Sequence, residues 1–198
     1  MKQFKIIFII LSVFSCISFV HMNQDNPTGL KKGEKAPEFN AKDHNGNDID
    51  LYKLLQKNEV VLFFYRGEWC GYCNRAMSEL QDSLHYITEK GAYVVAVTPE
   101  TNNNIGQTIE KTKASFSIIH DEGYKIMDLY KTTFAVDSVT VEKYKKWNID
   151  LENANGNEDH KLPVPATYVI GKDGIIKYVF FDKDYKKRAA VNDIINAL

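Results

Sequence analysis

The stretch that decides the fold runs from a block of apolar residues to a pair of cysteines. It reads Val60-Val61-Leu62-Phe63-Phe64-Tyr65-Arg66-Gly67-Glu68-Trp69-Cys70-Gly71-Tyr72-Cys73. The first five residues are apolar and β-prone, which is typical of a strand covered on both faces. After the second cysteine, apolar residues recur at helical spacing at Met77, Leu80, Leu84 and Ile87. The pattern therefore predicts a buried strand, a tight turn and a helix that begins at the cysteines.

The cysteine pair, Cys70 and Cys73, stands at the expected N-terminus of that helix. Unpaired backbone N–H groups and the positive end of the helix dipole favour the thiolate there, and the thiolate is the reactive form of a thiol. Two cysteines at this spacing can also close a disulfide and cycle between dithiol and disulfide. The spacing alone does not say which cysteine attacks first.

A Cys-x-x-Cys pair can instead be half of a zinc site, or an inert structural disulfide. A structural zinc site usually needs four ligands. The chain has no second cysteine pair, and His120 and His160 lie far from this one in sequence. Beside a strand–helix pattern the motif is typical of a redox centre. We therefore expect a redox role, with no metal and no organic cofactor.

Composition describes an ordinary globular chain. It has 198 residues, of which 44% are hydrophobic and 26% charged, and a formal net charge of −1. This length suits a single domain with a real core, and the near-zero charge argues against a nucleic acid partner. Only three cysteines occur, so the chain is not a small scaffold held together by disulfides.

The first 22 residues have the layout of a targeting segment. Lys2 and Lys5 precede an apolar run over residues 6–20 that contains Cys16. A cleaved secretory signal, an uncleaved membrane anchor and lipidation at Cys16 all remain open. We expect residues 23–31 to be a linker and residues 32–198 a single domain. That domain is expected outside the cytoplasm. It is expected either free in the periplasm or anchored to the membrane on the periplasmic side.

The rest of the chain alternates between strand and helix patterns. Expected strands lie at residues 92–97 and 116–119, expected helices at 49–55, 102–113 and 184–198, a hairpin around Asn45-Gly46, and a second hairpin at residues 162–181. Residues 138–161 suggest a helix fragment followed by a loop at 153–159. In the last helix, the charge of Arg188 is expected to stay in water.

Strand–helix–strand spacing around the cysteines predicts parallel pairing, and the late hairpin adds antiparallel strands. We therefore expect an α/β fold of three layers, in which a central mixed sheet is flanked by helices and preceded by an N-terminal hairpin extension.

These parts resemble a thioredoxin fold. Trp69-Cys70-Gly71-Tyr72-Cys73 is similar to the thioredoxin active-site turn, and Pro165 stands where that fold places a cis proline facing the cysteines. The resemblance implies a cis peptide bond at Pro165, well above the base rate for X–Pro bonds. It also implies that the backbone of Val164 is free to pair with a substrate.

A closer resemblance is to the peroxiredoxin-like branch of the alkyl hydroperoxide reductase and thiol-specific antioxidant family (AhpC/TSA). It covers about residues 32–198 and is carried by residues 33–39, 64–73, 162–168 and Asp184-Tyr185 with Arg188. It implies that Cys73 occupies the peroxidatic position. Cys70 then stands where the family has threonine, Arg66 where it has proline, and Pro165 where it has a second arginine.

More than one role is open for each of two charged residues of the turn. Arg66 either supplies a positive charge near the thiolate or is an exposed turn residue. Glu68 could relay a proton, could disfavour the thiolate by like-charge repulsion, or could be a solvated side chain.

The resemblance implies a thiol peroxidase with a hydroperoxide substrate and a thioredoxin-like protein as reductant. In this interpretation, which we favour, the Cys73 thiolate attacks the peroxide and Cys70 closes the disulfide. The alternative is an exported thiol–disulfide oxidoreductase, in which Cys70 attacks a protein disulfide and Cys73 resolves the mixed disulfide. A non-enzymatic binding module is a weaker third interpretation because both cysteines are present.

Overall fold

The computed structural model describes residues 26–198. The expectations for residues 1–22 therefore lie outside the described residues. Across residues 26–198, none of the helices has the length and apolar character needed to cross a membrane.

A five-stranded mixed sheet forms the centre of the molecule, with strand order β5-β4-β3-β8-β9. The strands are β3 (Glu59–Phe64), β4 (Ala92–Thr98), β5 (Ser117–His120), β8 (Ala166–Ile170) and β9 (Ile176–Phe181). β3, β4 and β5 run parallel, whereas β8 is antiparallel to both of its neighbours. The mixed sheet expected from the sequence is confirmed.

Helices cover both faces of this sheet. One face carries α2 (Gly71–Asp82), α3 (Leu84–Glu89), α4 (Asn102–Thr112) and α8 (Val191–Ala197), and the other carries α1 (Leu51–Leu55), the short 3₁₀ turn Glu122–Tyr124 and α5 (Lys125–Leu129). Side chains of β3 alternate between two buried clusters, with Val61 and Phe63 toward α2 and Leu62 and Phe64 toward α1. The two-sided burial explains the continuous apolar run of this strand and confirms the three-layer fold.

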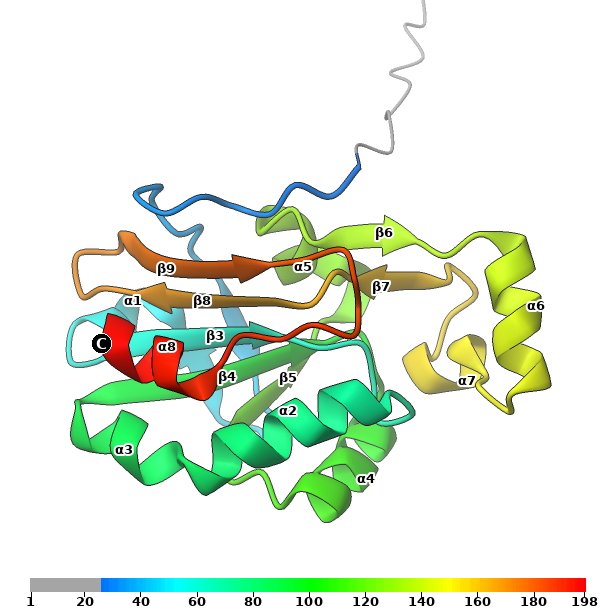
Figure 1. The fold of residues 1–198 in the computed structure, drawn as a ribbon, viewed down its shortest axis with the longest axis horizontal. Coiled ribbons are helices and arrows are strands. Elements are labelled where there is room, and N and C mark those ends of the chain that lie inside the picture. The colour runs from blue at the N-terminus through cyan, green and yellow to red at the C-terminus, as the bar shows by residue number, and fades with distance from the viewer. Residues whose placement is uncertain (1–25) are drawn as a thin grey trace, which may run out of the picture.

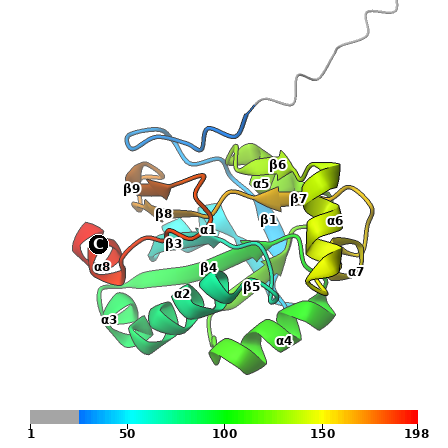
Figure 2. The same cartoon turned by 45° about the vertical axis from the view of Figure 1, so that its right-hand side comes forward.

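Two smaller antiparallel pairs lie outside the main sheet. β1 (Asn40–Lys42) and β2 (Asp48–Asp50) form the expected N-terminal hairpin, in whose turn Gly46 has a φ of 82°. β6 (Thr133–Ala135) pairs with β7 (Lys161–Pro163), and between them run α6 (Ser138–Lys146) and α7 (Leu151–Asn155). Figures 1 and 2 show these two helices as an arm beyond the end of the sheet where β3 leads into α2.

Three expected boundaries differ from the structure. The helix after the cysteines is interrupted at Ser83, where ψ is 4°, so the apolar stripe continues on α3. The loop expected at residues 153–159 begins later, because α7 continues to Asn155.

The helix expected at residues 184–198 is wrong in its first half, because α8 begins only at Val191. The carboxylate of Asp182 accepts the N–H of Asp184, and the carboxylate of Asp184 accepts the N–H of Lys186. Such local side-chain bonds hold the backbone in turns and compete with a helix.

Candidate active site

Cys70 and Cys73 lie where the turn after β3 enters α2. Cys70 is the N-cap residue of α2, and its Sγ accepts the backbone N–H of Cys73 at 3.3 Å. Both cysteines are buried and carry free thiols. The sulfur of Cys70 therefore takes the place that a Ser or Asp oxygen commonly takes at a helix N-terminus.

Arg66 places a guanidinium directly beside Cys70. Its Nη2 donates to Cys70 Sγ at 3.3 Å and its Nη1 to the hydroxyl of Tyr144 at 3.1 Å. The side chain is only 4% exposed, and its guanidinium lies 5.0 Å from the centroid of the Trp69 ring. The structure therefore agrees with the first interpretation of Arg66, a positive charge near the thiol, and not with the second, an exposed turn residue.

The two thiols have opposite pKa shifts. Hydrogen bonding from Cys73 and the adjacent Arg66, opposed by burial, lower the pKa of Cys70 to about 5. Burial and the neighbouring Cys70 raise the pKa of Cys73 well above its ordinary value. The hydrogen bonds from Arg66 and from the helix end favour Cys70 as the thiolate, whereas the family resemblance implies Cys73, and the thiol that attacks first stays a prediction. Cys73 is fully buried as the third residue of α2, whereas Cys70 is the N-cap residue, where the N–H of Cys73 and Arg66 both donate to its sulfur.

A second guanidinium reaches the sulfurs from the connection between β9 and α8. Arg188 Nη2 lies 3.0 Å from Cys73 Sγ and 3.8 Å from Cys70 Sγ. On the same connection, the ring of Tyr185 lies 4.1 Å from Cζ of Arg66. Figure 1 shows this red connection passing the end of the sheet at which β3 leads into α2. The charge of Arg188 is therefore at the thiols, which corrects the expectation that it stays in water.

Glu68 turns away from the thiols. Its carboxylate forms an ion pair with Lys111 of α4, and its backbone N–H donates to the carboxylate of Glu100. Glu100 is fully buried, also accepts the hydroxyl of Thr108, and has its pKa raised to about 7 by burial. Glu100 was not among the expected site residues, although a carboxylate two residues after a buried strand was the available signal.

Gly67 allows this close packing. A Cβ at this position would lie 2.5 Å from Nε1 of Trp69 and 2.8 Å from a carboxylate oxygen of Glu100. Both distances are shorter than real Cβ contacts, so a side chain at position 67 would displace the indole or the carboxylate.

The expectation of a cis peptide bond at Pro165 is wrong, since residues 26–198 contain none. Val164, buried between β7 and β8, donates its N–H to the carbonyl oxygen of Thr132 at 2.8 Å. This bond extends the pairing of β6 with β7 by one residue. The N–H of Val164 is therefore already used and is not free for an incoming chain.

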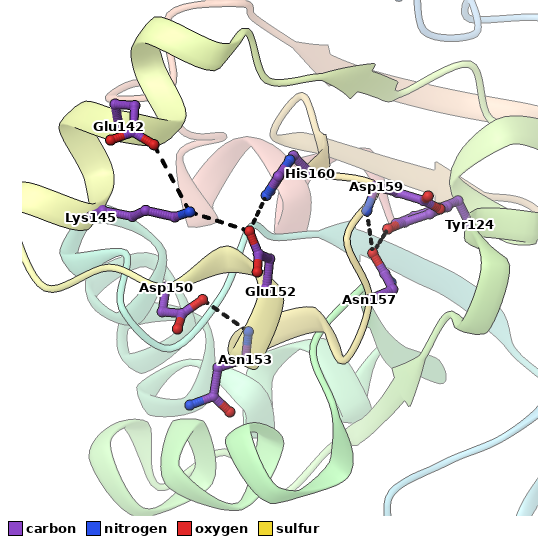
Figure 3. A network of polar contacts seen from close by, with 9 residues as sticks. All are labelled: Tyr124, Glu142, Lys145, Asp150, Glu152, Asn153, Asn157, Asp159 and His160. Carbon is purple, nitrogen blue, oxygen red and sulfur yellow. Dashed lines mark hydrogen bonds and ion pairs between the residues drawn. The ribbon is translucent and has the colours of Figure 1, made fainter.

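The arm supplies Tyr144, which was also not among the expected site residues. The ring of Tyr144 packs 5.5 Å from that of Trp69, centroid to centroid. A polar network holds the arm together (Figure 3), in which Glu152 of α7 pairs with Lys145 of α6 at 3.3 Å and with Nε2 of His160 at 2.9 Å. This network ties α6, the helix that carries Tyr144, to α7.

A cavity of about 300 Å³ opens beside Arg66, and neither cysteine is among its lining residues. Its walls include Arg66, Phe134, Val136, Tyr144, Val164, Pro165, Lys183 and Tyr185. The expected site residues Val164 and Pro165 thus share a cavity with Arg66. Within residues 26–198, no three or more His, Cys, Asp or Glu side chains are grouped so that they could hold a metal ion.

Comparison with known proteins places this geometry in a family context. A family model described as AhpC/TSA matches residues 32–179. Peroxiredoxin Q of rice (Oryza sativa subsp. japonica) is 24% identical over 151 residues, which are 76% of this chain and 59% of the rice protein. A peroxiredoxin of Helicobacter pylori, bcp, is 25% identical over 81% of this chain and 93% of its own.

Among solved structures, the peroxidoxin BcpB of Mycobacterium tuberculosis superposes with a TM-score of 0.65. It is 16% identical and covers 85% of this chain and 96% of its own. At this identity the likeness supports the fold. The chain spans about three fifths of the length of the first plant relatives that it matches.

Proposed function

We propose that this chain, which belongs to the AhpC/TSA family, is a thiol peroxidase that reduces hydroperoxides through Cys70 and Cys73. One observation carries the proposal. The sulfur of Cys70 accepts hydrogen bonds from Arg66 and from the backbone N–H of Cys73 at the N-terminus of α2, so its thiolate is stabilised by a buried cation and by the helix end.

In the first step, the Cys70 thiolate attacks one oxygen of the peroxide. An S–O bond forms, the O–O bond breaks, and the other oxygen leaves with its electron pair as alkoxide or hydroxide and takes up a proton. Cys70 is oxidised to a sulfenic acid and the peroxide is reduced to an alcohol or water. Arg66 stabilises the thiolate, and its charge also favours the oxyanion that leaves.

In the second step, Cys73 condenses with the sulfenic acid to form the disulfide and water. A thioredoxin-like dithiol protein then reduces this disulfide, so that the pair returns to its reduced state. We also propose that residues 1–22 direct the export of the domain. If they are retained, they tether it to the membrane.

The cavity beside Arg66 is the proposed place for the organic part of a hydroperoxide. Apolar walls from Phe134, Val136, Val164 and Pro165 face cationic Arg66 and Lys183 there. Such a lining suits a small molecule with an apolar body and a polar end.

A thiol–disulfide oxidoreductase is the second candidate. The order of the thiols favours it, because the cysteine nearer the N-terminus, Cys70, has the lowered pKa and would attack a protein disulfide. The occupied N–H of Val164 argues against it, because an extended peptide substrate has no free backbone donor at that position.

The test measures peroxide consumption by the purified protein with thioredoxin and its reductase and, in parallel, the reduction of insulin disulfides. Cys70→Ser and Cys73→Ser are compared by trapping sulfenic acid after one equivalent of peroxide. We expect Cys73→Ser to trap a sulfenic acid at Cys70, and Cys70→Ser to trap none.

Sulfenic acid at Cys73 in the Cys70→Ser variant, with none at Cys70 in Cys73→Ser, would reverse the roles of the two thiols. Insulin reduction without any reaction with peroxide would replace the peroxidase with the second candidate.

A further inference from the structure

The connection between β9 and α8 passes close to the two sulfurs, and we call it the strap. This strap, residues 182–190, contains no helix or strand. It brings Arg188 to 3.0 Å from Cys73 Sγ, from a position 115 residues away in sequence. The guanidinium is closer to Cys73 than to Cys70, from which it is 3.8 Å away.

The strap fixes the position of this guanidinium by itself. Nη1 of Arg188 donates to the carbonyl oxygens of Tyr185 and Lys187, both at 2.6 Å. The carboxylate of Asp182 also pairs with Nζ of Lys187 at 2.9 Å. Since the strap's own carbonyls orient the guanidinium, little reorganisation is needed when negative charge develops on the sulfur in front of it.

The two arginines thus serve different sulfurs. Arg66 contacts Cys70, the thiol that meets the peroxide. Cys73 is fully buried, and Arg188 is the cation whose charge opposes the rise in its pKa. A thiol attacks only as far as it has thiolate character, so the second step depends on whatever stabilises negative charge on Cys73.

We propose that Arg188 is a catalytic residue of the resolving step, which stabilises the sulfur of Cys73 while it attacks the sulfenic acid on Cys70. This inference rests on the proposed peroxidase function.

The step balances without another reactant. A lone pair on Cys73 Sγ forms the S–S bond, and the S–O bond of the Cys70 sulfenic acid breaks. The hydroxyl leaves with its electron pair and takes the proton of Cys73 as water. Both sulfurs end as the disulfide, and no outside electrons are needed. Arg188 Nη2 lies 3.0 Å from Cys73 Sγ and 3.8 Å from Cys70 Sγ, so its charge acts on the attacking sulfur and favours departure of the hydroxyl as it gains negative charge.

The test is a single turnover of the full chain with hydrogen peroxide, in which sulfenic acid formation and disulfide formation are followed separately. We expect Arg188→Met to slow disulfide formation at least about tenfold, while sulfenic acid formation changes less than about threefold. The slower resolution also leaves the sulfenic acid exposed to a second peroxide, so more sulfinic acid should form in excess peroxide.

Lys186→Met is the matched control, because it removes one positive charge from the same strap and Lys186 makes no contact with the sulfurs. It is expected to resolve at the wild-type rate. Arg188→Lys keeps a charge and should recover part of the rate, which a purely structural role of the guanidinium would not predict. The pH profile of disulfide formation should move to higher pH in Arg188→Met.

Disulfide formation at the wild-type rate in Arg188→Met would overturn this inference and leave the peroxidase in place. An equal slowing of both steps would also overturn it, since Arg188 would then not be specific to Cys73. If the wild-type protein forms no sulfenic acid, the proposed function fails, and the inference with it.

Discussion

Two regions bring a guanidinium to the cysteines, and they are built in different ways. The turn that carries Arg66 is buried, stands between β3 and α2, and is fixed by Tyr144 and Trp69. The strap that carries Arg188 has residues 183–187 exposed and holds its arginine with its own carbonyls. The charge beside Cys70 thus belongs to the folded core, whereas the charge beside Cys73 belongs to a peripheral segment. Changes in the turn should therefore alter pKa and stability together, and changes in the strap should leave stability nearly intact.

The largest expected effect is that of Arg66→Met. Loss of the cation that contacts Cys70 should raise the pKa of that thiol by roughly one to three pH units. The rate of alkylation of Cys70, measured against pH in a Cys73→Ser background, reports this pKa. With Arg66 present, the rate should be nearly constant above about pH 6 and fall below about pH 5, which is the pKa of Cys70.

Arg75→Met is the control, because this exposed arginine of α2 pairs only with Glu79 among the described residues. An unchanged alkylation profile in Arg66→Met would show that Arg66 does not lower the pKa of Cys70. The helix N-terminus and Arg188 of the strap would then account for the lowered pKa.

Glu100→Gln tests whether the turn belongs to the cooperative core. Burial raises the pKa of Glu100 from 4.5 to about 7, so the folded protein binds a proton that the unfolded chain releases. The neutral carboxyl therefore stabilises the fold fully below pH 4.5, and this stability is lost as the pH rises through 7. Against Glu100→Gln, the wild-type protein should lose up to about 3 kcal/mol of unfolding free energy over this window.

Urea unfolding of both proteins between pH 4.5 and 8 measures that difference. If the unfolding free energies of the two proteins changed in parallel with pH, the pKa of Glu100 would not differ between the folded and unfolded states. The turn would then not be part of the cooperative core.

Tyr144→Phe removes the hydroxyl that accepts from Arg66 and leaves the ring on Trp69. Because the donor is charged, its loss should lower the unfolding free energy by about 1.5 kcal/mol, as measured in urea. Tyr86→Phe, at an exposed position, should have no effect. Equal results for the two variants would contradict the view that the arm supports the turn.

The smallest effect is expected on the strap. Tyr185→Leu removes the ring that faces Arg66 at 4.1 Å, an interaction of about 0.5 to 1 kcal/mol where the ring is partly exposed. The thermal midpoint should fall less than in Tyr144→Phe, and exposed Tyr52→Leu is the control. A larger loss in Tyr185→Leu than in Tyr144→Phe would show that the strap is part of the core.

The same contrast explains what the sequence could predict. β3, the turn and the start of α2 follow from local patterns, namely an apolar run on β3 and a helical repeat after Cys73. The mixed sheet follows from the order of such patterns, and the structure confirms it. The individual strands and the helix depend on residues that are close together in the chain, whereas the pairing of β3 with β8 joins distant segments.

The strap and the roles of the thiols depend on long-range contacts. Tyr185 and Arg188 fall on the helical stripe of Val191, and nothing in their spacing shows that Asp182 and Asp184 hold turns instead. The contact of Arg188 with Cys73 joins segments 115 residues apart, which no local pattern reports.

Tyr144, Glu100 and Pro165 show the same limit. Tyr144 and Glu100 act through neighbours that only the fold provides. The peptide bond at Pro165 is trans, and the N–H of Val164 is bonded to Thr132, a partner that the flanking residues do not reveal.

The packing at Gly67 has a consequence for how this turn can diverge. A methyl group there would collide with both the Trp69 indole and the Glu100 carboxylate, whereas a methyl group at Gly71 would meet no atom within 4 Å. In a saturation library of the chain, position 67 should tolerate glycine alone, and position 71 should accept many residues. Gly71, one of the two residues between the cysteines, is thus open to natural variation, whereas Gly67, three residues before Cys70, is not.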